Sequence, residues 1–171
     1  MDGKTVNNSR VILRHIVQPQ DANLAGIPHG GVVMKNIDDA AGVVAVKHSG
    51  CAVVTASIDR MDFHHPVYIG NLLTIKASIN MVGQTSMEIG VRVEAEDIVT
   101  GKSRHTASAY LTFVALDRNN KPTRIPPLIL VTKEEKRRNR EAGDRRKVRL
   151  AEKSKEKKCR RDPDDCQPIK A

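Results

Sequence analysis

The sequence predicts an α+β fold in which one long, buried helix lies against a single curved antiparallel sheet of about five strands. Two observations lead to this prediction. One stretch of the chain repeats its apolar residues with the period of a helix, and later segments alternate apolar and polar residues as strands do. Short turns separate these segments, and consecutive strands joined by short turns pair in antiparallel fashion. We expect the domain to cover residues 1–130.

The helix is expected from Gly31 to about His48. Its apolar residues recur every three or four positions, and further valines widen the apolar surface until most sides of the helix are apolar. A helix of this kind is usually buried. Gly50 follows it, and glycine favours the left-handed conformation in which helices commonly end.

Five segments have the composition of strands. The first, residues 9–18, precedes the helix and ends at Pro19, which lacks the N–H group that a sheet requires. The other four follow the helix and cover residues 52–62, 72–81, 86–98 and 104–116. The last of them is apolar on both faces. We therefore expect this strand to take part in pairing with a second subunit.

The net charge of +9 is distributed unevenly along the chain. Residues 1–130 hold 13 basic and 11 acidic side chains, whereas residues 131–171 hold 16 and 9, so the basicity belongs mostly to the C-terminal tail. The tail has almost no apolar stripe. We expect it to be a solvated helix as far as about Lys158, or a disordered extension. Binding of nucleic acid or an anionic surface by the tail is the less favoured alternative, because aromatic residues do not interleave its charges.

The composition also bears on the cellular compartment. The chain has no run of about eighteen apolar residues and no apolar segment typical of a secretory signal near its N-terminus, so no membrane span is expected. The three cysteines, Cys51, Cys159 and Cys166, are odd in number and lack CxxC spacing. We therefore expect neither a disulfide framework nor a metal site, and a cytoplasmic location.

Chemistry is expected where the loop of residues 20–30 meets the helix. The first backbone N–H groups of a helix are unpaired and carry partial positive charge. Glycines at positions 30 and 31 let a carbonyl oxygen approach these groups and become polarised. Asp38 lies about two turns later on a similar face and can activate water or attack a carbonyl, while Asn23 can orient the water or bond the carbonyl.

Plainer interpretations remain open at this point. Asp38 or Asp39 can be a solvated helix position, His29 a turn residue, and His64 and His65 surface residues. The chain has no G-x-S-x-G elbow, no His-x-x-x-His pair and no P-loop. Serine hydrolases, zinc hydrolases and nucleotidases are therefore not favoured.

Several motifs, in the right order and with the right gaps, resemble the hot-dog-fold acyl-CoA thioesterases. The resemblance covers about residues 8–128 and is to the cytosolic acyl-CoA hydrolase branch, which includes the YciA-type and brain-type enzymes. The tail from about Lys133 has no counterpart in it. The motifs are Asp21-Ala22-Asn23, Gly26, His29-Gly30-Gly31, Ile37 to Ala41, Met61-Asp62-Phe63, Pro66-Val67, Gly70, Thr85 to Ile89, Ala109-Tyr110 and Phe113 to Asp117.

The resemblance implies a fold and an assembly. The helix is the core of a hot-dog fold, and the antiparallel sheet wraps around it. The unit is a homodimer whose sheets join edge to edge, often assembled further into a hexameric trimer of dimers. The active site lies at the dimer interface. Asn23 and Asp38 match the catalytic asparagine and acid, contributed by opposite subunits, and the carbonyl-polarising amide falls at about Gly31.

The implied activity is hydrolysis of acyl-CoA to a free acid and CoA. CoA is part of the substrate, so no separate cofactor is expected. Further contacts to the substrate or to CoA are expected from His29, Gly30, Gly83, Thr85 and Ser86. A thioester is already activated, so an aspartate and a polarised carbonyl suffice, with Asp38 as general base or as nucleophile. The alternative is a hot-dog protein that binds acyl-CoA or a lipid as a regulator without turning it over.

Overall fold

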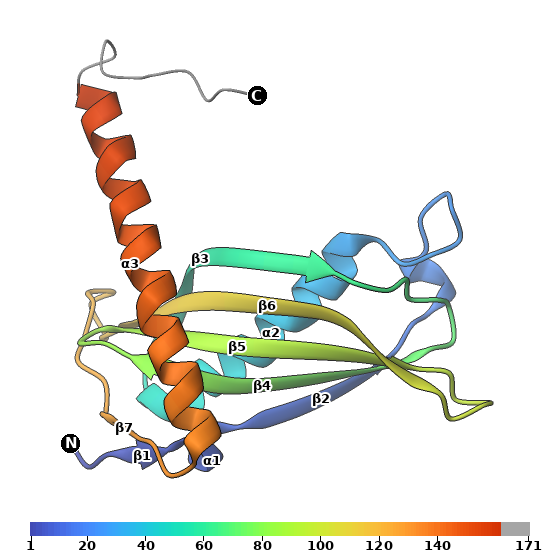
Figure 1. Ribbon diagram of the computed structural model, residues 1–171, viewed down its shortest axis with the longest axis horizontal. Helices are drawn as coiled ribbons and strands as arrows, with labels where there is room; N and C mark the ends of the chain where they lie inside the picture. Colours follow the sequence, from blue (N-terminus) through green and yellow to red (C-terminus); the bar gives the residue numbers. More distant parts are fainter. Residues whose placement is uncertain (162–171) are drawn as a thin grey trace.

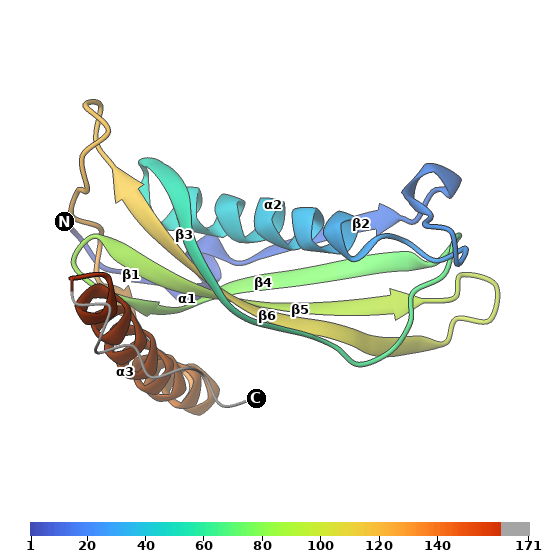
Figure 2. The same cartoon turned by 90° about the horizontal axis from the view of Figure 1, so that it is seen from above.

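A computed structural model describes residues 1–161 of the chain, with side chains as far as residue 156. Five strands form one antiparallel sheet, and the helix α2 (Gly30–Ser49) lies across its inner face (Figures 1 and 2). The strand order is β2-β4-β5-β6-β3. The bounds are β2 (Val11–Ile16), β3 (Ala52–Phe63), β4 (Leu72–Val82), β5 (Ser86–Glu96) and β6 (Ser103–Leu116). The predicted α+β, hot-dog-like arrangement is therefore confirmed.

The helix α2 forms the centre of the core. Its buried side includes three small residues, Ala40, Ala41 and Ala45, each without exposed surface. Small side chains let the sheet approach the helix closely, while Ile37 and Val44 fill the space between them. Gly50 ends the helix as expected, in the left-handed conformation at φ 70°. In the described part of the chain, no helix combines the length and apolarity needed to cross a bilayer.

Short elements near the chain ends close the fold beside the end of α2. The strand β1 (Lys4–Thr5) pairs in parallel with β7 (Leu128–Ile129), and the single-turn helix α1 (Val6–Ser9) follows β1. The Nζ atom of Lys4 donates hydrogen bonds to the last carbonyls of α2, at Lys47 (3.0 Å) and His48 (2.8 Å). The positive charge of Lys4 is also stabilising there, because the C-terminal end of a helix carries partial negative charge.

The strand predicted to take part in subunit pairing, β6, lies inside the sheet. It has β5 on one side and β3 on the other, so its backbone is already paired. Its apolar inner face packs against α2, and its outer face is partly covered by the C-terminal helix. Residues 104–116 therefore offer no open backbone edge, and their expected part in pairing with a second subunit stays a prediction. β2 and β3 form the two edges of the sheet, and β3 exposes Val54 and Ile58.

The C-terminal helix α3 (Lys133–Arg161) crosses the outer face of the sheet (Figures 1 and 2). Ala142, on the side of α3 that faces the sheet, is fully buried, so the expectation of a solvated helix is wrong for the first half of α3. The contacts advance from strand to strand. Asn139 donates to the carbonyl oxygen of Asn80 on β4 at 2.9 Å, Arg145 pairs with Glu88 on β5, and Arg149 pairs with Asp59 on β3.

Past Arg149 the described side chains of α3 are exposed, as the solvated-helix prediction expected. The predicted tail continues through residues 162–171, which lie outside the described residues together with Cys166 and the side chain of Cys159. Cys51, the remaining cysteine, is a half-buried free thiol.

Candidate active site

The loop before α2 presents Asn23 at one end of the molecule. A 3₁₀ turn (Pro19–Asp21) opens the loop, and a bridge between Ala22 and Pro28 closes it. The backbone N–H of Asn23 donates to Ile27 at 2.8 Å, and its side-chain Oδ1 accepts the N–H of Ala25 at 2.8 Å. The loop therefore fixes the asparagine and engages its oxygen. This leaves the Nδ2 amino group as the donor for a water or a carbonyl.

The start of α2 has no side-chain cap. His29 is the N-cap residue, yet its side chain makes no capping hydrogen bond. A Cβ atom added to Gly31 would meet nothing within 4 Å, and one added to Gly30 would meet only Phe63, at 3.6 Å. Packing within this chain therefore does not require glycine at either position. The first amides of the helix remain open to an approaching group.

A hollow of about 390 Å³ lies beside Asn23 and Gly30. Its wall is mostly apolar, and its other residues are not among those predicted to bind substrate or to act in catalysis. They are Ile27, Pro28, Val33, Phe63, His64, His65, Pro66 and Val67. The His64 ring lies 4.9 Å from that of His105, and burial lowers the pKa of His105 below its usual range. The hollow can hold an apolar group next to the asparagine and the helix start.

The two acids of α2 have different surroundings. Asp39 pairs with Lys35 at 2.6 Å, and half of its side chain is exposed, at 51%. This hydrogen bond raises the pKa of Lys35. Asp38 is half-buried and accepts a hydrogen bond of 2.8 Å from the Thr55 hydroxyl on β3. The solvated interpretation thus applies to Asp39, whereas Asp38 is oriented by a second element. Sequence reasoning missed Thr55, because nothing in its spacing relates it to the helix.

One chain does not bring the predicted residues into one place. Asp38 lies eight residues beyond Gly30, about 12 Å along the helix axis, and does not line the hollow. The β4–β5 turn lies at the opposite end of the sheet from the Asn23 loop (Figure 1). In this turn Gly83 donates to Ser86 at 2.7 Å, and Thr85 accepts the N–H of Ala115 at 2.9 Å. The predicted site residues therefore form three separate groups within one chain.

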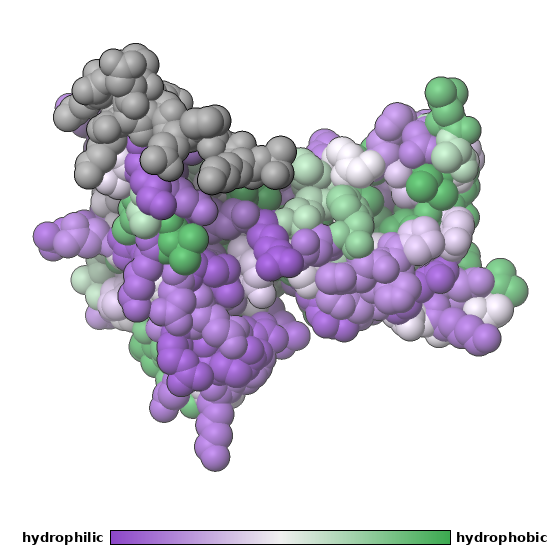
Figure 3. Space-filling view, turned by 45° about the horizontal axis from the view of Figure 1, so that its top comes forward, coloured by the Kyte–Doolittle hydropathy of each residue, from purple (hydrophilic) through white to green (hydrophobic). Residues whose placement is uncertain are grey.

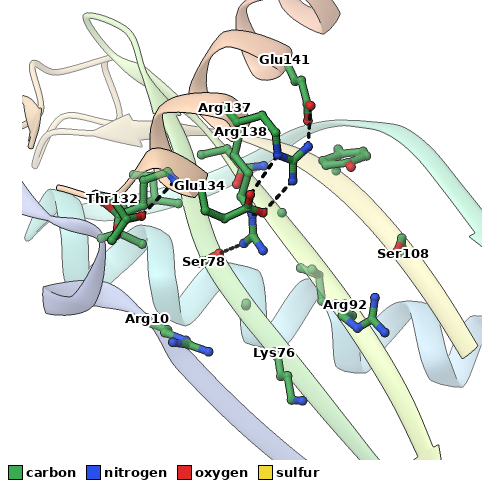
Figure 4. A pocket seen from close by; sticks show the side chains of 18 of the residues that line it. Arg10, Lys76, Ser78, Arg92, Ser108, Thr132, Glu134, Arg137, Arg138 and Glu141 are labelled. Atoms are coloured by element: carbon green, nitrogen blue, oxygen red, sulfur yellow. Dashed lines mark hydrogen bonds and ion pairs between the residues drawn. The ribbon is translucent and has the colours of Figure 1, made fainter. Parts of the chain in front are cut away.

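A larger cleft, of about 560 Å³, lies on the outer face of the sheet under the first turns of α3 (Figure 4). None of the predicted site residues lines it. Its charges are largely paired: Lys76 and Arg92 bind Glu94, which lies outside the lining, and Glu134 binds Arg137 and Arg138. Hydrophilic residues dominate the surface of α3, and the apolar patches of this face of the molecule lie away from the helix (Figure 3). This cleft is not the candidate active site.

Comparison with known proteins identifies relatives of this chain. Residues 25–102 match the family model described as the thioesterase superfamily. The cytosolic acyl coenzyme A thioester hydrolase of Rattus norvegicus is 39% identical over 143 residues, which cover 82% of this chain. The same match covers 38% of the rat protein, so the chain spans well under half the length of that relative.

Solved structures show the same fold over nearly the whole chain. An acyl-CoA hydrolase from Staphylococcus aureus, in complex with butyryl coenzyme A, coenzyme A and coenzyme A disulfide, is 36% identical with a TM-score of 0.84. The match covers 91% of this chain and 94% of that one. The same hydrolase has been solved with alanine replacing an aspartate, an asparagine or a threonine.

A structure described as an apo-hexameric acyl-CoA thioesterase is 38% identical with a TM-score of 0.85. The match covers 89% of this chain and 97% of that one. The chain therefore belongs to the thioesterase superfamily, in the branch of the cytosolic acyl-CoA thioester hydrolases.

Proposed function

We propose that this protein hydrolyses acyl-CoA thioesters to free acids and CoA, with CoA as part of the substrate and no separate cofactor. The observation that carries the proposal is the Asp38 carboxylate, held by Thr55 on a helix whose uncapped start adjoins Asn23 and an apolar hollow. The S. aureus hydrolase adds support. Its substituted asparagine and aspartate are fifteen residues apart and its aspartate and threonine seventeen, the spacings of Asn23, Asp38 and Thr55.

The proposed reaction needs few groups. The thioester carbonyl oxygen binds the Gly31 amide at the helix start, and the Asn23 amino group donates to this oxygen or to the attacking water. In the general-base form, Asp38 takes a proton as the water oxygen bonds the carbonyl carbon. The C–S bond then breaks, and the proton passes to the departing CoA thiolate. In the nucleophilic form, Asp38 attacks the carbonyl, and water hydrolyses the resulting anhydride.

The proposed site is shared between two chains. Within one chain Asn23 lines the hollow before α2 and Asp38 does not, so an asparagine from one subunit is paired with an aspartate from the other. β3, one of the two edge strands of the sheet, supports the edge-to-edge dimer, because it exposes Val54 (45%) and Ile58 (39%) beside unpaired backbone groups. The hexameric relative supports further assembly into a trimer of dimers. The cytosolic description of the rat relative supports a cytoplasmic location.

The test is release of free thiol from a panel of acyl-CoAs of different chain length. Wild type releases thiol, Asp38→Ala and Asn23→Ala lose most of this activity, and the control Asp39→Ala retains it. Mixing the two inactive variants restores part of the activity if the site is shared, because a mixed dimer carries one intact site. Wild-type rates in Asp38→Ala would contradict the assigned site. Tight acyl-CoA binding without thiol release would favour the non-catalytic regulator instead.

A further inference from the structure

The strand that orients Asp38 is irregular beside the residue that does so. Thr55 lies opposite Phe113 of β6, which packs in the core toward α2. Ser57 lies opposite Thr112, the preceding residue of β6, which points to the other face of the sheet and is buried there. Residues two apart in an unbroken strand face the same side. A register shift between Thr55 and Ser57 accounts for the reversal, and bulges of this kind re-aim side chains next to functional sites.

A second register shift follows between Ile58 and Arg60 and leaves Asp59 without a partner residue on β6. Asp59 is held from two sides instead. Ser57 donates a hydrogen bond of 3.0 Å to its Oδ1, and Arg149 of α3 pairs with its Oδ2. The side chains of Asp59 and Arg149 are only 13% and 14% exposed. β6 pairs with β3 on one side only, and the two register shifts interrupt that pairing around Asp59. The ion pair with Arg149 therefore adds a fixed point where the pairing with β6 is interrupted.

Arg149 is itself held in place by the preceding turns of α3. One turn earlier, Arg145 binds the fully buried Glu88 at 2.6 Å, and its guanidinium lies 3.7 Å from the Tyr110 ring centroid. Ala142, fully buried, sets the distance between the helix and the sheet. These contacts hold α3 against the sheet up to the point where it reaches β3. β3 is clamped between α2, through Asp38 and Thr55, and α3, through Asp59 and Arg149.

We propose that Arg149 is a positioning residue for the thioesterase reaction. Through Asp59 it fixes the bulged segment of β3, and this segment places the Thr55 hydroxyl against Asp38. The C-terminal helix thus contributes to turnover from the face of the sheet opposite the site. This inference rests on the proposed function, because it assigns Arg149 a role in the chemistry of Asp38.

The test measures kcat and KM for thiol release, with thermal midpoints recorded in parallel. Arg149→Ala lowers kcat by about tenfold, the effect of one lost hydrogen bond on a barrier, with KM unchanged. The reversed pair, Asp59→Arg with Arg149→Asp, recovers part of the loss. Lys147→Ala removes the same charge from an exposed position of the same helix and leaves kcat unchanged.

A double-mutant cycle separates this role from general support of the fold. If Arg149 acts through Thr55, adding Arg149→Ala to Thr55→Val lowers kcat little further. Full additivity of the two losses in kcat, or wild-type kcat in Arg149→Ala, would overturn the role of Arg149. The proposed function would still stand in either case, as long as the wild-type protein releases thiol. A wild-type protein that releases no thiol from any acyl-CoA would overturn the proposed function, and the role of Arg149 with it.

Discussion

The carboxylate of Glu88 on β5 has no exposed surface and binds the guanidinium of Arg145 on α3 through two hydrogen bonds, of 2.6 and 3.2 Å. The Asn80 amide donates a third, of 3.1 Å, to the same carboxylate. Burial alone lowers the pKa of Arg145, but the bonds to Glu88 outweigh this effect and raise it. The pair fixes one position of α3 on the sheet, because a shift of the helix would leave the buried carboxylate of Glu88 without its counter-ion.

Removing one partner of this pair should therefore destabilise the protein strongly. Glu88→Ala leaves the part-buried Arg145 without its counter-ion, and we expect a loss of about 3 kcal/mol in the free energy of unfolding. Urea denaturation measures it. Glu152→Gln, an exposed change on the same helix, should leave the midpoint unchanged. A Glu88→Ala loss below about 0.5 kcal/mol, the range of neutral surface changes, would show that the pair does not anchor α3.

Two glycine-to-alanine changes should act in opposite directions. A Cβ atom at Gly90 would lie 2.6 Å from Asn80 Nδ2, which is already bound to Glu88, so Gly90→Ala should cost about 1–3 kcal/mol. A Cβ atom at Gly143, inside α3, would meet nothing within 4 Å, so Gly143→Ala should stabilise by about 0.5–1 kcal/mol. Denaturant midpoints of the two variants test both signs. A stabilised Gly90→Ala would mean that Asn80 moves aside freely.

Stability should fall in mild acid because of His48. Burial lowers the pKa of this fully buried ring, whose Nε2 donates to the carbonyl oxygen of Pro126 at 3.1 Å. The unfolded chain takes up its proton near pH 6.5, whereas the folded chain resists it, so stability present above that pH is lost as the pH falls toward the folded pKa. The unfolding midpoint of wild type should drop more between pH 7.5 and 5 than that of His48→Gln. The exposed His29→Gln should follow wild type, and equal slopes in all three would rule out His48 as the cause.

The Thr55 hydroxyl should matter for turnover rather than for substrate binding. Thr55→Val keeps the shape of the side chain but removes the donor to Asp38, and we expect kcat to fall by about tenfold or more at unchanged KM. Thr55→Ser retains the hydroxyl and should keep most of the rate. Steady-state thiol release measures both. Wild-type rates in Thr55→Val together with a loss in Thr55→Ser would indicate that the methyl group, not the hydrogen bond, is required.

The main elements could be predicted from the sequence because their periodicity is unambiguous. The alternation through Leu73, Ile75 and Ala77 marks β4, and Gly50 marks the end of α2. The elements β1, α1 and β7 are too short to show any period. Docking of α3 escaped prediction because the residues that it sets against the sheet are one alanine, Ala142, and two arginines, Arg145 and Arg149, which do not form an apolar stripe.

The candidate site was predictable only in part. The family resemblance assigns roles to Asn23 and Asp38, and the structure gives Asp38 and Asp39 the different surroundings that spacing alone does not distinguish. Thr55 could not be found in this way. It comes near Asp38 only because β3 lies at the edge of the sheet, a position decided by pairing with β6 far along the chain.

The same strand order has a consequence for synthesis on the ribosome. β3 ends at Phe63, but its neighbour in the sheet, β6, begins only at Ser103, after β4 and β5 have emerged. α3, which carries Arg149, emerges later still. A nascent chain therefore holds the Thr55 and Asp59 segment unpaired while most of the domain is made, and such delayed long-range pairing slows folding and exposes an aggregation-prone strand. The last contacts to form are those proposed to orient the carboxylate, so a chain that stalls before the C-terminal helix should be folded in outline but poorly active.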